Sequence, residues 1–380
     1  MGPQHPSTHG VLRLELVLDG EMVVRATPDI GYLHTGMEKL FEYKKYQQGI
    51  VITDRMDYLN PLGNNLAYAL AVERLFDCPI PERAQVARVL LAELTRINSH
   101  LVWLGTTGLD LGASSLFLYA FREREVLLDL FEEMSGARMM TSFIRPGGLF
   151  SDLTSDWLQK VRDFLNVLPA RIDEYEALLT DNPLFKERTI GIGVLKTEDA
   201  LAFGVSGPML RASGVPHDLR KTNPYSGYER FSFETPTRSG GDCYDRYVVR
   251  IAELRESIKL CHQALDNLPE GPVRTPDRKV MPPTRAELQH SMEALIHHFK
   301  LYTEGYHVPA GDVYVATESP KGEFGVYLVA DGTNKPYRCK IRAPGFAHLQ
   351  AMDFLCRGHM LADVSAVIGS LDIVFGEVDR

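Results

Sequence analysis

Apolar residues recur along this chain with two periods, one typical of helices and one typical of strands. The helical period is clearest in residues 81–104, where the apolar stripe is formed by Val86, Val89, Leu90, Leu94, Ile97, Leu101 and Leu104. The same period, bounded by capping residues, glycine or proline, predicts helices at 37–48, 61–75, 114–135, 156–179, 242–268, 285–302 and 346–368. Pro169 predicts a kink or break in one of them.

Strict alternation of apolar and polar residues predicts strands near both ends of the chain. Residues 12–17 and 22–26 alternate on either side of Asp19-Gly20, which is typical of a hairpin turn. Residues 312–341 contain three further alternating runs divided by glycine turns. The expected fold class is therefore α+β, a bundle of long helices with small antiparallel sheets near both ends.

Four segments are expected within one structural domain. They are an N-terminal β hairpin with a loop (1–60), a helical bundle (61–182), an extended segment rich in glycine and proline (183–241), and helices, a β meander and a buried C-terminal tail (242–380). An uninterrupted loop as long as 183–241 is uncommon in a compact domain unless it is functional. We therefore expect this segment to wrap around a partner.

Composition narrows the class of protein. The 380 residues are 44% hydrophobic and 24% charged, as in ordinary globular proteins. A formal charge of −9 argues against nucleic acid as a partner. No apolar run is long enough to span a bilayer, and the 5 cysteines have no CxxC spacing. These features indicate a soluble or peripheral protein in a reducing compartment, with no metal held by cysteine.

The first ten residues, Met1-Gly-Pro-Gln-His-Pro-Ser-Thr-His-Gly10, are the first candidate for a functional site. Pro3 and Pro6 lack amide donors and fix φ, so this segment is a stiff loop that could place an imidazole accurately. His5 and His9 could instead only hydrogen-bond to their own turn. No convincing third ligand is present, so we expect no metal there.

Tyr58 and Asp110 are two further candidates. Tyr58 lies just before a predicted helix start at Asn60-Pro61. Asp110 lies in the glycine-rich stretch 105–112, which is expected to end the preceding helix. Taken alone, Tyr58 would be a packing residue and Asp110 a turn former. Neither residue establishes an activity by itself.

Seven motifs together resemble the D-type subunit family of the proton-pumping NADH:quinone oxidoreductase, respiratory complex I. They are Gly2-Pro-Gln-His-Pro-Ser-Thr-His-Gly-Val-Leu-Arg13, Asp54-Arg-Met-Asp-Tyr58, Arg145-Pro-Gly-Gly148, Gly241-Asp-Cys-Tyr-Asp-Arg246, Pro320-Lys-Gly-Glu-Phe-Gly-Val-Tyr327, Ala343-Pro-Gly-Phe-Ala-His348 and Asp372-Ile-Val-Phe-Gly-Glu-Val-Asp-Arg380. The resemblance covers essentially the whole chain.

This family is similar in fold to the large subunit of nickel–iron hydrogenases. The four cysteine ligands of those enzymes correspond here to Asp57, Asn60, Val374 and Glu377. Because the soft thiolate ligands are absent, hydrogenase activity is not expected. The likeness implies a hydrogenase-large-subunit-like fold, in which the former metal cavity is the end of a quinone channel.

The resemblance also implies roles for individual residues. His9 and Tyr58 would hydrogen-bond the headgroup of ubiquinone or menaquinone, with His5 in the same loop, and Asp110 would be the partner of His9. This chain alone would hold no cofactor. Electrons would come from a tetranuclear iron–sulfur cluster in a neighbouring subunit, and Met140 and Arg145 would face that cluster. Many family members carry histidine where this chain has Met140.

Two functional hypotheses follow. In the first, the chain is the quinone-site subunit of a proton-translocating complex and is active only when assembled. Its implied partners are the B-type iron–sulfur subunit, the C-type subunit and the H-type membrane subunit, at the cytoplasmic face of the bacterial plasma membrane. In the second, it is a structural scaffold subunit of a related membrane-bound, hydrogenase-like complex. Tyrosine and histidine are suitable proton donors for quinone reduction, which favours the first hypothesis.

Overall fold

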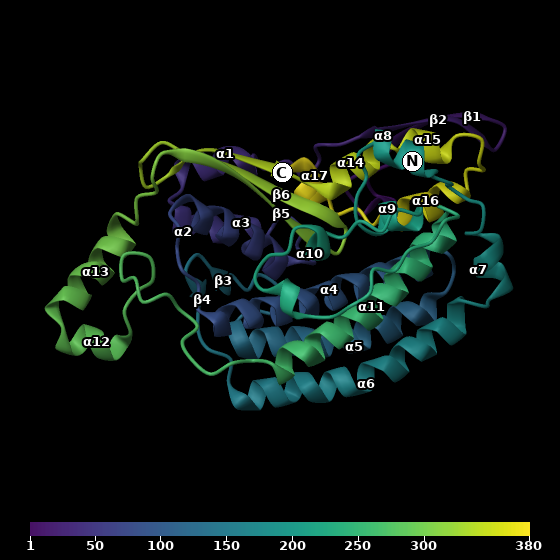
Figure 1. The fold of residues 1–380 in the computed structure, drawn as a ribbon. Coiled ribbons are helices and arrows are strands. Elements are labelled where there is room, and N and C mark those ends of the chain that lie inside the picture. The colour runs from purple at the N-terminus through teal and green to yellow at the C-terminus, as the bar shows by residue number, and fades with distance from the viewer.

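The computed structural model describes all 380 residues and confirms an α+β fold built on a helix bundle (Figure 1). The long helices are α3 (Pro61–Leu75), α4 (Glu82–Asp110), α5 (Ser114–Ser135), α6 (Ser155–Leu179) and α11 (Cys243–Asp266). Helix α4 lies at the centre, because it packs against α3, α5 and α11. The apolar faces of these five helices form the largest core cluster.

Small antiparallel sheets lie near both ends of the chain, as the alternating patterns predict. The first is the hairpin of β1 (Arg13–Asp19) and β2 (Met22–Asp29), and a tiny second hairpin joins β3 (Ile144–Arg145) to β4 (Gly148–Leu149). The third sheet has the order β5-β6-β7, with bounds Gly311–Ser319, Gly322–Ala330 and Pro336–Arg342. Its buried residues pack with α1–α3 in a separate core cluster.

Short helices occupy most of the remaining chain. They are α1 (Met37–Tyr43), α2 (Tyr46–Thr53), α7 (Pro183–Glu187), α8 (Thr197–Ala202), α9 (Pro208–Ala212), α10 (Leu219–Thr222), α12 (Arg285–His290), α13 (Met292–Thr303), α14 (Pro344–Gln350), α15 (Met352–Cys356), α16 (Asp363–Leu371) and α17 (Phe375–Asp379), with 3-10 turns η1 (Pro6–Thr8) and η2 (Tyr228–Arg230). The single helices predicted at 37–48, 285–302 and 346–368 are therefore each divided. In one case Ser291 has extended backbone and its side chain caps α13.

Helix α4 does not end at Gly105, so the predicted glycine-rich corner around Asp110 is wrong. The helix continues to Asp110. A Cβ at Gly105 would lie 3.4 Å from Phe117 Cα, and a Cβ at Gly108 would lie 2.6 Å from Leu116 Cδ2. These glycines therefore allow α4 and α5 to approach closely. Helix α6 also continues unbroken through Pro169.

Residues 183–241 are not an uninterrupted loop, since they contain α7 to α10 and η2. Buried ion pairs fix this segment to the bundle. Arg211 Nη2 lies 2.6 Å from Glu253 Oε1 in α11, and Arg220 Nη1 lies 3.1 Å from Glu93 Oε1 in α4. The segment thus wraps around the chain's own core, and its contact with a partner stays a prediction.

The two ends of the chain meet in one apolar cluster. Leu12 and Leu14 of the N-terminal segment belong to the same cluster as Phe375 and Val378 of α17. The C-terminal tail is buried, and its residues Phe375–Asp379 form helix α17. None of the helices combines the length and apolar character that a membrane span requires.

Candidate functional site

The N-terminal loop forms η1 and is held by its own hydrogen bonds. The buried Thr8 hydroxyl donates to the His5 carbonyl at 2.7 Å. His5 Nδ1 accepts the Ser7 amide at 3.2 Å, so this nitrogen is used within the turn. His9 follows with a left-handed φ of 54°. Neither ring nitrogen of His9 forms a hydrogen bond within the chain.

Asp110, the last residue of α4, is joined to this loop through Ser7. The Ser7 hydroxyl donates to Asp110 Oδ1 at 3.0 Å. His9 is exposed on one side, yet the surrounding protein reduces its hydration, and this desolvation lowers the pKa of His9. The carboxylates of Asp372 and Asp110 raise that pKa, and Lys321 lowers it. The structure thus brings His9 and Asp110 to one place without a direct hydrogen bond between them.

Tyr58 lies in the turn before α3 and is half-buried. Its hydroxyl forms no hydrogen bond within the chain. Burial raises the pKa of Tyr58, the Asp57 carboxylate raises it further, and the Lys321 ammonium opposes both effects. Tyr58 is therefore un-ionised at neutral pH, and its hydroxyl is free to donate to a ligand.

Asp57 belongs to a cluster of buried charged residues centred on Lys321. Lys321 Nζ lies 3.1 Å from Asp57 Oδ2 and 3.8 Å from Asp372 Oδ1. It also donates to the Ser99 hydroxyl at 2.8 Å. The Lys321 ammonium lowers the pKa of both His9 and Tyr58.

Glu377 of α17 is also part of the cluster and is fully buried. Its Oε1 accepts the Gly345 amide at 3.2 Å, while its Oε2 has no partner. Burial and the Asp57 carboxylate raise the pKa of Glu377 to about 8, against the opposing effect of Lys321. Asp57 and Glu377 thus come together around an ammonium group.

The sequence alone does not single out Lys321, because no spacing connects it with Asp57 or Glu377. The segment Lys321-Gly-Glu-Phe-Gly325 lacks the number of glycines that a phosphate-binding loop has. Lys321 lies in the turn from β5 to β6. The signal that could have found it was the pair of acidic residues, Asp57 and Glu377, at positions where the resemblance implies the cysteine ligands of hydrogenases. Two carboxylates buried together need a cation nearby, and the search for that cation would have led to a lysine.

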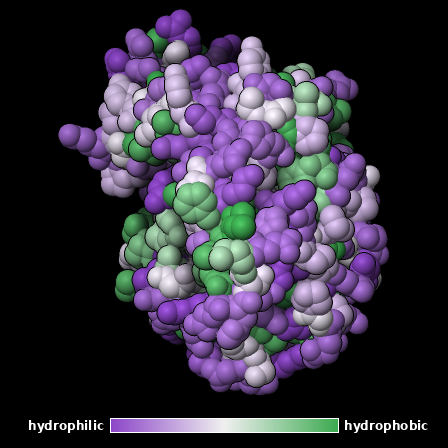
Figure 2. Space-filling model, turned by 90° about the vertical axis from the view of Figure 1, so that its left-hand side faces the viewer, coloured by the Kyte–Doolittle hydropathy of each residue, from purple (hydrophilic) through white to green (hydrophobic).

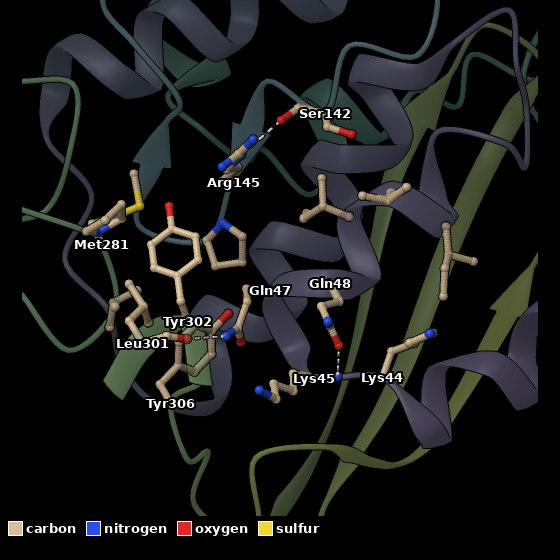
Figure 3. A pocket seen from close by; sticks show the side chains of 16 residues that line it. Lys44, Lys45, Gln47, Gln48, Ser142, Arg145, Met281, Leu301, Tyr302 and Tyr306 are labelled. Atoms are coloured by element: carbon tan, nitrogen blue, oxygen red, sulfur yellow. Dashed lines mark hydrogen bonds between the residues drawn. The ribbon is translucent and has the colours of Figure 1, made fainter. Parts of the chain in front are cut away.

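Met140 and Arg145 lie on the segment between α5 and α6, and both are half-buried. Arg145 Nε donates to the Ser142 carbonyl at 3.0 Å, as Figure 3 shows. Its guanidinium lies over the Phe150 ring, 4.4 Å from the centroid, and desolvation lowers the pKa of Arg145. Arg145 also lines a cavity of about 490 Å³, which does not include His9 or Tyr58.

Comparison with known proteins identifies the family. The model of the family "Respiratory-chain NADH dehydrogenase, 49 Kd subunit" matches residues 110–380. The chain belongs to this family. D-type subunits of NADH-quinone oxidoreductase also match along the whole chain. Identity is 62% to the second D-type subunit of Chloroflexus aurantiacus and 61% to the first D-type subunit of Roseiflexus castenholzii, of which 93% and 92% are covered.

Similarity to the D-type subunits extends to more distant organisms. The NADH-quinone oxidoreductase D-type subunit of Wolbachia pipientis wMel is 55% identical, with all of this chain and 97% of the relative covered. The resemblance seen in the sequence motifs is therefore confirmed, and the chain is a subunit of an oxidoreductase complex. The roles of individual residues stay predictions.

Proposed function

We propose that this chain forms the quinone headgroup site of the complex, with Tyr58 and His9 as the groups that bind and protonate the quinone. The observation that carries this proposal is that both residues lack hydrogen-bond partners within the chain. Several other histidines are bonded to the backbone. For example, His34 Nδ1 lies 2.7 Å from the Asp379 carbonyl, and His348 Nε2 accepts the Ser206 amide.

Reduction of a quinone requires two electrons and two protons, one for each carbonyl oxygen. Electrons come from the tetranuclear cluster of the B-type iron–sulfur subunit in this proposal. As negative charge develops on one oxygen, the Tyr58 hydroxyl donates its proton, which a phenol gives up only to a strong base such as reduced quinone. Preplaced donors of this kind stabilise the developing charge. Lys321 stabilises the phenolate that remains, because it lowers the Tyr58 pKa.

His9 supplies the second proton from its imidazolium form. Asp372 and Asp110 favour this form, because their carboxylates raise the His9 pKa against the effect of burial. His5 contributes to the site through the shape of η1, since its Nδ1 is engaged by Ser7. Asp110 holds the loop through Ser7 and acts on His9 electrostatically.

The remaining parts of the proposal concern the assembly. We place the chain between two other subunits of the complex. One is the B-type iron–sulfur subunit, which carries the cluster near Met140 and Arg145. The other is the H-type membrane subunit, from which ubiquinone or menaquinone enters, and the C-type subunit lies alongside. The chain is then a peripheral subunit at the cytoplasmic face of the plasma membrane, and quinone protonation at this site is coupled to proton translocation by the membrane subunits.

The test is the variant Tyr58→Phe in the assembled complex, because it keeps the ring and removes only the hydroxyl. We expect quinone-reductase turnover to fall roughly 10²-fold, the usual loss for a positioned proton donor. Tyr327→Phe is the matched control, since it removes a hydroxyl that contacts Asp312 at the surface. If Tyr58→Phe keeps wild-type turnover with every quinone tested, the structural scaffold hypothesis is the better one.

A further inference from the structure

Helices α12 and α13 form an arm that projects from the side of the molecule (Figure 1). The arm has almost no core of its own, because α12 has no buried residue and α13 buries only Ala294 and Leu301. One face of α13 is instead apolar and exposed. This face, which we name the α13 stripe, consists of Met292, Leu295, Ile296, Phe299 and Tyr302.

The α13 stripe has the pattern of a helix face that packs against another element. Its members follow the spacing i, i+3, i+4, i+7, i+10. Met292 is 72% and Phe299 66% exposed, so the stripe is uncovered in this chain. Figure 2, which views the side from which the arm projects, shows apolar residues gathered near the centre of this face. Contiguous exposed apolar patches mark interaction sites in soluble proteins.

The stripe continues into the cavity of about 490 Å³ (Figure 3), because Tyr302 belongs to both. Three cationic residues, Lys44, Lys45 and Arg145, line this cavity, and no carboxylate does. The nearby Asp54 is buried behind it, where it accepts hydrogen bonds from Ser142 and Asn65. The lining of the cavity therefore carries positive charge and no carboxylate, and the Asp54 carboxylate acts on Arg145 from behind it.

A lipid surface is a poor match for this face. Helices that lie on membranes carry clustered lysine and arginine on their polar side. The polar side of α13 has one glutamate, Glu293, one lysine, Lys300, and two histidines. The cations of the cavity line a recess, which a flat membrane surface does not enter. A protein segment with apolar and acidic side chains fits both the stripe and the recess.

We propose that the α13 stripe and the adjoining cavity dock an amphipathic segment of another subunit of the same complex. Apolar side chains of that segment cover the stripe, and one of its carboxylates enters the cavity beside Arg145. This docking rests on the proposed assembly with neighbouring subunits and is independent of the quinone chemistry. The arm is then ordered by its partner, which supplies the core that the arm lacks.

The first test uses a photo-crosslinking amino acid at position 299 in the assembled complex. The expected product is a crosslink to another subunit, at a peptide that contains aspartate or glutamate. The same amino acid at Glu293, on the polar side of α13, is the matched control and should give at least tenfold less of this product. Crosslinks to lipid, to a second copy of this chain or to no molecule would each overturn the proposal.

The second test is the variant Ile296→Asp, with Glu293→Ala as its control on the same helix. Ile296 is 51% exposed, so the thermal midpoint of the purified chain should not change. The fraction of this chain in the assembled complex on native gels should fall at least tenfold, while turnover per assembled complex stays at the wild-type value. Wild-type assembly of Ile296→Asp would contradict the docking. Wild-type quinone turnover in Tyr58→Phe, which would contradict the proposed quinone site, would leave the docking intact.

Discussion

Both the backbone and the side chain of His9 have contacts that fix the position of this residue. It is the C-cap of η1, where its N–H donates to the Pro6 carbonyl, and it has a left-handed φ of 54°. This conformation is uncommon for residues other than glycine. Its ring also faces Phe375, with 6.1 Å between the centroids. The stiffness of the loop could be predicted from Pro3 and Pro6, but the contact with a residue near the opposite end of the chain could not.

The electrostatic link between Asp110 and His9 predicts a shift in pH dependence. Asp110→Asn keeps the shape of the side chain and removes a negative charge that raises the His9 pKa. The His9 pKa should then fall further, so the imidazolium exists only at lower pH and the optimum of quinone reduction moves to lower pH. The measurement is the pH–rate profile of the assembled complex, with the exposed Asp129→Asn as control. A profile of Asp110→Asn that superimposes on wild type would refute the link.

In the proposed assembly Met140 faces the iron–sulfur cluster of the neighbouring subunit, and it predicts a lower and less pH-dependent midpoint potential than in relatives that carry histidine. Methionine neither titrates nor donates a hydrogen bond, whereas a cationic or donating group near a cluster raises its potential. Met140→His should therefore raise the midpoint potential and make it fall as pH rises through the imidazole titration. Redox titrations followed by electron paramagnetic resonance at several pH values measure this, with Met139→His as the neighbouring control. Identical, pH-independent midpoints would show that residue 140 has no influence on the cluster.

Among the elements, α4 shows that a glycine within a helical pattern can serve close packing and need not end the helix. Gly105 and Gly108 were expected to end the helix, and instead they let α5 pack closely against it. Both roles use the missing side chain, and the choice depends on a neighbour that sequence spacing does not reveal. The outcome matters for the site, because the additional turns of α4 carry Asp110 to the N-terminal loop.

Gly376 in α17 allows the C-terminal helix to lie close to the turn that carries Tyr58. A Cβ at this position would lie 2.2 Å from the Met56 carbonyl oxygen and 2.6 Å from that of Arg55. Gly376→Ala should therefore displace α17 and Glu377, lower the free energy of unfolding by about 1–3 kcal/mol and reduce quinone turnover.

The control for Gly376→Ala is Gly311→Ala, because the Cβ at Gly311 would have its nearest neighbour, Leu75 Cδ2, at 3.9 Å. The measurements are the thermal midpoint of the chain and the turnover of the assembled complex. If Gly376→Ala matches Gly311→Ala in both, the close approach of α17 has no importance for the site.

At the scale of the whole molecule, the site is built from segments that are far apart in the sequence. The site combines four parts of the chain. His9 directly follows η1, and Tyr58 lies in the turn before α3. Asp110 ends α4, and Asp372 lies in the turn before α17. Periodicity predicted the long helices and the sheets, because these depend on local pattern. It could not predict that both chain ends share one core. Only the family resemblance indicated a common site for His9, Tyr58 and Asp110, and the place of Asp372 beside His9 was not predicted.

The central claim is that the quinone headgroup lies between Tyr58 and His9, and a structure of the assembled complex with bound quinone tests it most directly. The account predicts that one carbonyl oxygen of the quinone lies within hydrogen-bonding distance of the Tyr58 hydroxyl and that His9 can reach the headgroup through a ring nitrogen. A headgroup bound away from both residues, for example in the cavity lined by Arg145 and Tyr302, would contradict it.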